Sequence, residues 1–197
     1  MSKSFVLLWS LLVFPLLSSC GLVVVDGFSS KLNRLSEEEK ARVFRTDAPI
    51  ASLPCDSNVY IVGEAQIWDC IRQHDSCVVY DWYPSCPYSI TPSQFEQCCD
   101  SMGYYPIIIM SCFCYHGFNR FDTRHTPILF PDLEPYHTNI VYKYMNQFSK
   151  NMTGEEQEMS VFWRYRGGEF ISFIYKNWNG GTLKLDVNPP LADVVNE

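Results

Sequence analysis

The residues of this sequence whose side chains are most reactive are its nine cysteines. One is Cys20, and the other eight lie between positions 55 and 114: Cys55, Cys70, Cys77, Cys86, Cys98, Cys99, Cys112 and Cys114. Neither Cys98-Cys99 nor Cys112-x-Cys114 has the gap of two to four residues with which paired thiolates bind tetrahedral zinc, so we expect no metal site. An even set of eight is typical of disulfide bonding in an oxidising compartment, although the sequence leaves their pairing open.

The N-terminus carries a signal for export that ends at Cys20. One lysine precedes residues 5–17, a run of thirteen that is apolar except for one serine. A membrane-spanning helix needs about twenty apolar residues, so this run has the length of a signal-peptide core. The four residues that end at Cys20, LSSC, resemble the bacterial lipobox, in which the cysteine is lipidated and becomes the mature N-terminus. We expect residues 1–19 to be removed; an ordinary secretory signal is the alternative.

The expected address of the protein follows from this N-terminus. A lipidated Cys20 would hold the chain to a membrane of the cell envelope, on the periplasmic side or the outer surface, with residues 20–34 as a tether. The formal net charge of −7 argues against nucleic-acid binding, which needs clustered basic residues. The same charge argues against electrostatic docking on anionic lipids, which leaves the lipid anchor as the expected membrane contact.

The elements that must position the cysteines alternate between strands and helices. We expect one domain over 35–197, with strands at 59–62, 77–82 and 106–110, helices at 36–44, 64–74, 91–102 and 138–150, and a closing hairpin at 160–175. The segment 115–136 is rich in proline, histidine and aromatic residues, and we expect it to be irregular. Alternating strands and helices imply parallel pairing through right-handed crossovers, whereas the closing hairpin is antiparallel. The expected class is therefore α/β.

This order of elements is that of the thioredoxin fold, and two segments strengthen the resemblance. Residues 78–89 (VVYDWYPSCPYS) resemble the thioredoxin strand that runs through a tryptophan into W-C-x-x-C. Residues 162–170 (FWRYRGGEF) resemble its closing hairpin. Together with the lipobox, the stretch 35–175 resembles thioredoxin-like lipoproteins found in Bacteroidota. The resemblance implies a thioredoxin-like fold, in which helices flank a central mixed sheet of parallel strands plus a C-terminal antiparallel hairpin.

The same resemblance gives Cys86 a chemical role. In thioredoxins and glutaredoxins the first cysteine of the motif lies at a helix N-terminus that lowers its pKa, and the second resolves the mixed disulfide. Here Ser89 replaces the second cysteine, as in monothiol glutaredoxins, which act with glutathione. The resemblance thus implies Cys86 as nucleophile, Ser89 as a hydrogen-bond donor and Cys112 or Cys114 as a resolving cysteine. It implies glutathione or another small thiol as co-substrate, and thiol-containing envelope proteins as partners.

A second hypothesis is a non-catalytic thioredoxin-like lipoprotein that binds a partner. Structural disulfides would then involve Cys55, Cys70, Cys77, Cys98 and Cys99, with Cys86 as one more partner. The capping signal at Thr91 begins the next helix five residues after Cys86, which removes the thiol from the helix dipole. Thioredoxins also have a cis-proline just before the closing hairpin. Residues 158–160 contain no proline, and the similar Thr126-Pro127 precedes the last helix.

Histidine and aromatic side chains offer weaker signals. His116, His125 and His137 lie in or beside the irregular segment, and we expect them to be solvated or to cap loops rather than to act as acids, bases or metal ligands. Seven aromatic residues could form one surface for an extended peptide or a glycan. Those considered are Trp82, Tyr83, Tyr88, Tyr104, Tyr105, Tyr115 and Tyr136.

Overall fold

The computed structural model describes residues 35–84, 89–110, 113, 125–138, 141–154, 162–179 and 182–186. Within these ranges lie eight strands, four helices and two short 3-10 turns. The expected signal peptide (1–19) and the tether (20–34) lie outside them, as do Cys86, Cys112 and Cys114. The predictions for those segments therefore stay predictions.

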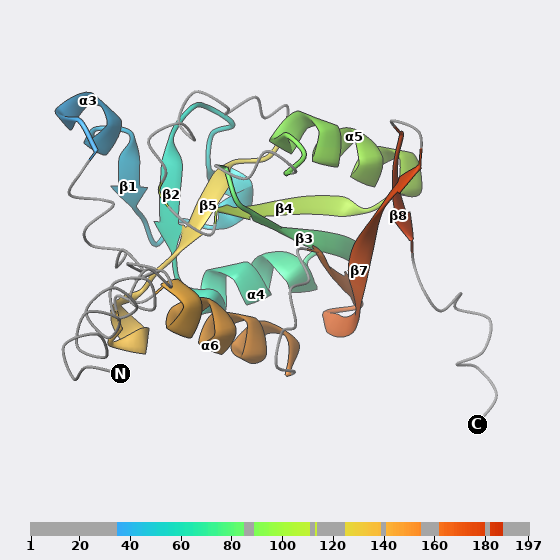
Figure 1. The fold of residues 1–197 in the computed structure, drawn as a ribbon. Coiled ribbons are helices and arrows are strands. Elements are labelled where there is room, and N and C mark those ends of the chain that lie inside the picture. Colours follow the sequence, from blue (N-terminus) through green and yellow to red (C-terminus); the bar gives the residue numbers. More distant parts are fainter. Residues whose placement is uncertain are drawn as a thin grey trace, which may run out of the picture.

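The strands form a mixed sheet in the order β1-β2-β5-β4-β3-β6-β7-β8 (Figure 1). Their bounds are β1 Val43–Arg45, β2 Val59–Val62, β3 Ser76–Trp82, β4 Tyr105–Met110, β5 Ile128–Pro131, β6 Phe162–Arg166, β7 Glu169–Asn179 and β8 Thr182–Asp186. Strands β1 to β5 are parallel, and β6 to β8 are antiparallel to their neighbours. β8 pairs only with the far half of β7. An α/β protein with a parallel core and a C-terminal antiparallel hairpin is thus confirmed.

The helices cover both faces of the sheet. They are α3 Glu37–Lys40, α4 Glu64–Arg72, α5 Pro92–Met102 and α6 Val141–Thr153, and the 3-10 turns are η1 Ile50–Ser52 and η3 Glu134–Tyr136. Helices α4 and α6 lie on one face and α5 lies on the other (Figure 1). Aromatic contacts join each layer to the sheet: Trp68 of α4 contacts Tyr165, and Phe95 of α5 contacts Phe162, each with ring centroids 5.7 Å apart.

Local sequence signals explain where several of these elements begin and end. Ser36 and Thr91 each form a capping box, in which side chain and backbone exchange hydrogen bonds with the third helical residue. Helix α5 stops at Gly103, whose φ of 71° is open to glycine at little cost. The β6–β7 turn uses Gly167-Gly168, both with positive φ, as a tight hairpin requires.

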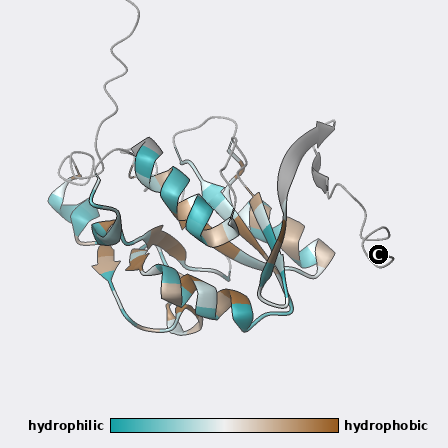
Figure 2. Ribbon diagram, turned by 90° about the horizontal axis from the view of Figure 1, so that it is seen from below, coloured by the Kyte–Doolittle hydropathy of each residue, from teal (hydrophilic) through white to brown (hydrophobic). Residues whose placement is uncertain are grey.

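The core lies between the sheet and its two helical layers. All of Pro106–Met110 in β4 is buried, as expected for a strand covered on both faces. The helices instead carry both hydrophilic and hydrophobic residues (Figure 2), because only one side of each faces the sheet. The largest fully buried side chains are aromatic, and Trp82 and Trp163 are both completely enclosed.

The segment 115–136 contains a strand that the sequence analysis did not expect. Residues Ile128–Pro131 form β5, which is buried throughout and lies between β2 and β4. A run of four apolar residues is long enough for such a central strand, but Pro127 and Pro131 at its borders made it look irregular. Pro131 is tolerated because it is the last residue of the strand. The expectation of a wholly irregular segment was therefore wrong.

Candidate functional site

The carboxyl ends of four adjacent parallel strands meet at one edge of the sheet. They are Val62 of β2, Pro131 of β5, Met110 of β4 and Trp82 of β3. Ligands of open α/β sheets bind outside such ends, because the connecting loops diverge there. Trp82 and Met110 are directly paired. Cys86 follows Trp82 by four residues in the sequence and Cys112 follows Met110 by two, but both cysteines lie outside the described residues.

The N-terminus of α5 is occupied by its own capping residues. Thr91 Oγ1 accepts a hydrogen bond from Gln94 N at 3.3 Å, and Gln94 Oε1 accepts one from Thr91 N at 3.0 Å. Pro92 follows as the first helical residue, and Tyr80 donates from its hydroxyl to the carbonyl of Ile90 at 3.1 Å. Ser89, the fourth residue of the CPYS motif, lies in a half-buried bend before this cap. The described helix therefore begins six residues beyond Cys86.

Thr126-Pro127, which resembles a redox cis-proline segment, lies at the opposite edge of the sheet. It precedes β5, whose amino end faces away from the carboxyl ends of β3 and β4. The fully buried Glu96 of α5 holds it there by accepting from Thr126 N at 2.9 Å and from His125 N at 3.1 Å. Thr126-Pro127 therefore lies at the opposite end of the parallel strands from Trp82.

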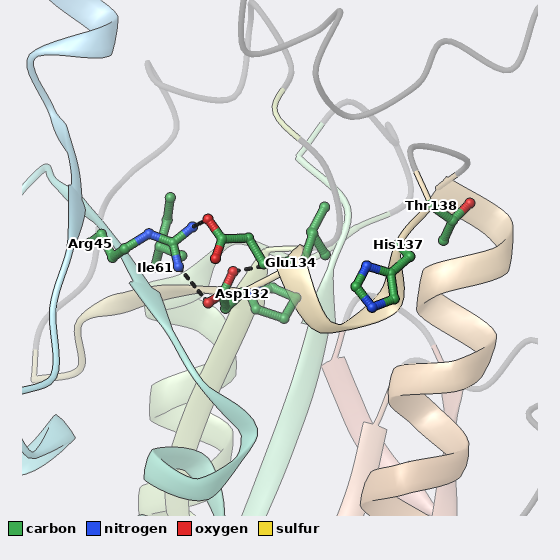
Figure 3. Close-up of a pocket in the computed structure, with 8 residues that line it drawn as sticks. Arg45, Ile61, Asp132, Glu134, His137 and Thr138 are labelled. Carbon is green, nitrogen blue, oxygen red and sulfur yellow. Dashed lines mark hydrogen bonds and ion pairs between the residues drawn. The ribbon is translucent and has the colours of Figure 1, made fainter.

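A pocket of about 310 Å³ opens at the carboxyl edge beside β1 and β5 (Figure 3). It is lined by Arg45, Ile61, Pro131, Asp132, Leu133, Glu134, His137 and Thr138. Three of its walls come from segments distant in sequence: the end of β1, the middle of β2 and the chain that leaves β5. Because β5 lies beside β2, the residues that follow β5 lie next to those of β1 and β2 and complete the pocket.

Charged groups of opposite sign meet on one wall of this pocket. Arg45 forms an ion pair with Asp132, and its second terminal nitrogen lies 3.3 Å from Glu134 Oε1. Asp132 also accepts a hydrogen bond from Glu134 N at 3.1 Å. The hydrogen bond to Asp132 raises the pKa of the Arg45 guanidinium. With two carboxylates for one guanidinium, the wall is net negative, and it favours hydrogen-bond donors or a cation over an anion.

His137, on the far side of the pocket from Arg45 in Figure 3, has a backbone conformation that histidine rarely adopts. Its φ is 48°, and it is the one non-glycine residue with positive φ among those that the structure describes. This left-handed conformation costs about 1–2 kcal/mol. Tyr136 is anchored next to it, since its hydroxyl donates to Glu64 Oε1, which also accepts from Asn151 at 2.8 Å. Such strain is retained where neighbours fix the backbone, often beside a binding site.

The expected single aromatic surface is divided between the two edges of the sheet. Tyr104 and Tyr105 line a pocket of about 460 Å³ at the amino edge, with His125 on its wall. Tyr105 stacks on His74 with ring centroids 3.5 Å apart, and burial raises its pKa to about 12. Tyr83 and Tyr136 follow strand ends at the carboxyl edge, and Trp82 is buried. These positions therefore do not form one surface; Tyr88, Tyr115 and His116 lie outside the described residues.

Four of the cysteines are thiols in environments that suppress ionisation. Burial raises the pKa of Cys70 to about 11 and of Cys77 to about 12, and it raises that of the buried Cys99 further. Cys55 is exposed, and its pKa is also raised, first by partial desolvation and then by Glu96 and Asp56. Cys98 is half-buried on α5. No disulfide joins two of these five cysteines, and bonding to the other cysteines stays a prediction.

Two further features concern the described part of the chain only. There, no three His, Cys, Asp or Glu side chains gather closely enough to hold a metal ion. None of the helices in those ranges is both long and apolar enough to cross a membrane.

No family model, curated protein or solved structure matches this chain. What the protein does must therefore be inferred from its own residues.

Proposed function

We propose that this chain is an exported, lipid-anchored protein of thioredoxin-like type that binds a ligand or partner in the cell envelope and does not catalyse thiol–disulfide exchange. One observation carries the second half of the proposal. The helix that would have to activate Cys86 begins only at Pro92, and its Gln94 backbone amide is bonded to the helix's own cap, Thr91. Because dipole stabilisation falls off within the first turn, a thiol six residues before the helix gains little from it.

Fold topology supports binding in another way. The succession of β2, α4, β3, α5, β4, α6 and the β6–β7 hairpin follows the thioredoxin order, with β5 added between β2 and β4. The added strand delivers Asp132, Glu134 and His137 to the carboxyl edge, where they line the pocket. A departure from the thioredoxin order that creates a pocket favours a binding function for this edge.

The membrane address rests on the N-terminal sequence. LSSC at positions 17–20, after an apolar run of signal-peptide length, supports a diacylated Cys20 and an envelope location. Labelled palmitate should enter the full chain and should be lost in Cys20→Ser, while the control Cys55→Ser keeps it. Label that persists in Cys20→Ser would contradict the lipid anchor without bearing on the binding proposal.

Reactivity of Cys86 provides the main test. The rate of alkylation of each cysteine should be measured by mass spectrometry between pH 5 and 10 on the full chain, before and after mild reduction. We expect Cys86 either to be disulfide-bonded or to titrate near the ordinary thiol pKa of about 8.5. Cys55 is the matched control, because it is exposed and its pKa is raised. A Cys86 thiolate already formed below about pH 7 would contradict the proposal.

A thiol–disulfide function is the second candidate, favoured by the direct pairing of Trp82 with Met110. In that reaction the Cys86 thiolate attacks a protein–glutathione disulfide, forms a new disulfide with the glutathione and releases the protein thiol. A second glutathione then regenerates Cys86 and leaves as glutathione disulfide. Turnover of a glutathionylated peptide that Cys86→Ala abolishes and Cys55→Ala retains would establish this function in place of the first.

The binding proposal also predicts which ligands the carboxyl-edge pocket prefers. Its net negative wall should prefer a ligand that presents an ammonium group beside hydroxyls. Glucosamine and glucose form a matched pair of probes, since they differ in one ammonium group. We expect glucosamine to raise the unfolding temperature more than glucose does, and Glu134→Gln to remove the difference, because Glu134 is exposed and makes little structural contribution. Equal responses to both sugars would contradict this ligand class.

A further inference from the structure

Arg164, in the middle of β6, is a buried arginine with no counter-charge among the residues that the structure describes. Only 3 % of it is exposed, and its Nε and Nη1 are fully enclosed. Within the part of the chain that the structure describes, neither nitrogen has a hydrogen-bond partner. Most buried polar groups are satisfied, so an orphaned pair of guanidinium donors indicates a missing acceptor.

A second orphaned group lies directly across the strand pair. Ser172 of β7 is the register partner of Arg164, and its Oγ is also buried without a partner. Directly opposite residues project from the same face, with Cβ atoms about 4.5–5.5 Å apart. Phe162 precedes Arg164 by two residues and stacks on Tyr80 and Phe95, so alternation places this pair on the face that α5 covers. The two orphaned groups therefore lie on neighbouring strands, directly opposite each other and on the same face of the sheet.

The chemistry of arginine restricts what can satisfy them. A buried lysine can lose its proton, but the guanidinium keeps its charge at any pH that a folded protein survives. An unpaired buried charge is strongly destabilising, and a water molecule would supply an acceptor without neutralising it. Val78 of β3, the register partner of Arg164 on its other side, is apolar and fully buried. The missing group is therefore an acceptor that carries negative charge.

We propose that Arg164 and Ser172 form a binding site for one small anion, a carboxylate or a phosphate- or sulfate-type oxyanion. The guanidinium neutralises the anion and the serine hydroxyl donates a further hydrogen bond. The site is separate from the carboxyl-edge pocket, whose arginine already has two carboxylate partners. It does not rest on the binding function proposed above, so either can fail without the other.

Anion-dependent unfolding of the full chain tests the site. Protein dialysed against chloride should be titrated with acetate, phosphate and sulfate at constant ionic strength while its unfolding temperature is measured. We expect a saturable rise with at least one of the three, at a stoichiometry of one anion per chain by equilibrium dialysis. Sulfate and phosphate also stabilise proteins by exclusion from their surface, but that effect does not saturate.

Variants locate the effect. Arg164→Met should lose the saturable response, Arg164→Lys should retain it with at least tenfold weaker binding, and Ser172→Ala should weaken it without abolishing it. Arg166→Met is the matched control, because Arg166 lies on the same strand and is exposed. It should bind the anion as the wild type does.

Two results would overturn the site. One is an equal response of the wild type and Arg164→Met to all three anions. The other concerns the carboxyl groups of this chain outside the described residues, such as those of Glu156, Glu158 and Asp193. The site would be overturned if the wild type showed no response to the anions and a variant with one of these groups changed to an amide did respond. That second result would identify the partner of Arg164 as the chain itself. If Arg164→Met does not fold, Arg164→Lys and Ser172→Ala still decide between the outcomes.

Discussion

Two arginines of this protein lie in opposite electrostatic situations. Arg45 ends an edge strand, keeps about half of its side chain in solvent (51 %), and contacts two carboxylates. Arg164 lies in a central strand, is almost wholly buried, and has no carboxylate within reach among the described residues. The exposed Arg45 thus contacts two carboxylates, whereas the buried Arg164 contacts none among the described residues. Exposed pairs contribute little to stability, so only the arrangement at Arg164 requires an explanation.

The neighbour of Arg164 shows what the same strand gains from an apolar side chain. Trp163 projects to the opposite face, is fully buried, and contacts Phe148 of α6 with ring centroids 5.6 Å apart. Trp163→Ala should lower the free energy of unfolding by about 3–5 kcal/mol, because it leaves a large cavity. Denaturant unfolding measures this. Ile171→Ala, at an exposed site, is the control and should cost less than about 1 kcal/mol.

Arg164→Met should have an effect of the opposite sign when no binding anion is present. Replacing an unneutralised buried charge by an apolar side chain of similar length is expected to leave stability unchanged or to raise it by about 1–4 kcal/mol. The measurement is the free energy of unfolding in chloride buffer. A loss of more than about 2 kcal/mol would mean that Arg164 already has a partner there, and the contrast with Arg45 would disappear.

Much of this fold was predictable from the sequence, because its signals are local. The capping boxes at Ser36 and Thr91, the glycine at 103 and the Gly167-Gly168 turn each act within a few residues. Strand β5 was missed because Pro127 precedes it and Pro131 ends it, and β1 was missed because a strand of three residues is too short to show a periodic pattern. Both omissions hid the carboxyl-edge pocket. Arg45 and Asp132 are 87 residues apart, and only the order β1-β2-β5 brings them together.

The burial of Arg164 was hidden for a different reason. The sequence Trp163-Arg164-Tyr165-Arg166 alternates apolar and basic residues, which normally indicates a strand with one face in solvent. Here α5 covers the second face, so the alternation does not report exposure at Arg164, although it does at Arg166. Whether a strand has one covered face or two depends on helices elsewhere in the chain, and a local pattern cannot contain that information.

The buried thiols differ from Arg164, because a buried thiol can stay protonated and neutral, whereas the guanidinium keeps its charge. Burial raises the pKa of Cys77 from 9.0 to about 12 and that of Cys70 to about 11. In this range the unfolded chain has released protons that the folded chain still holds, so stability is fully present below pH 9 and falls as pH rises toward 11–12. Each thiol should contribute about 1.4 kcal/mol per pH unit.

Denaturant unfolding between pH 8 and 11 tests this dependence. Cys77→Val should reduce the slope, because it removes one buried thiol while keeping an apolar side chain of similar volume. Cys55→Ser, at an exposed site, should change it much less. An unchanged slope in Cys77→Val would show that Cys77 is not a titrating thiol, as expected if it forms one of the disulfides that the sequence favours.

The smallest effect is expected at Arg45, and it completes the contrast. Arg45→Met should lower the free energy of unfolding by no more than about 1 kcal/mol, and most of that loss should vanish in high salt, because the pair with Glu134 is largely exposed. A double-mutant cycle with Asp132→Asn isolates the better-shielded pair. A coupling energy well above 1 kcal/mol, insensitive to salt, would mean that this wall of the pocket behaves like a buried network. Its carboxylates would then be held rigidly for a ligand even though Arg45 is half in solvent.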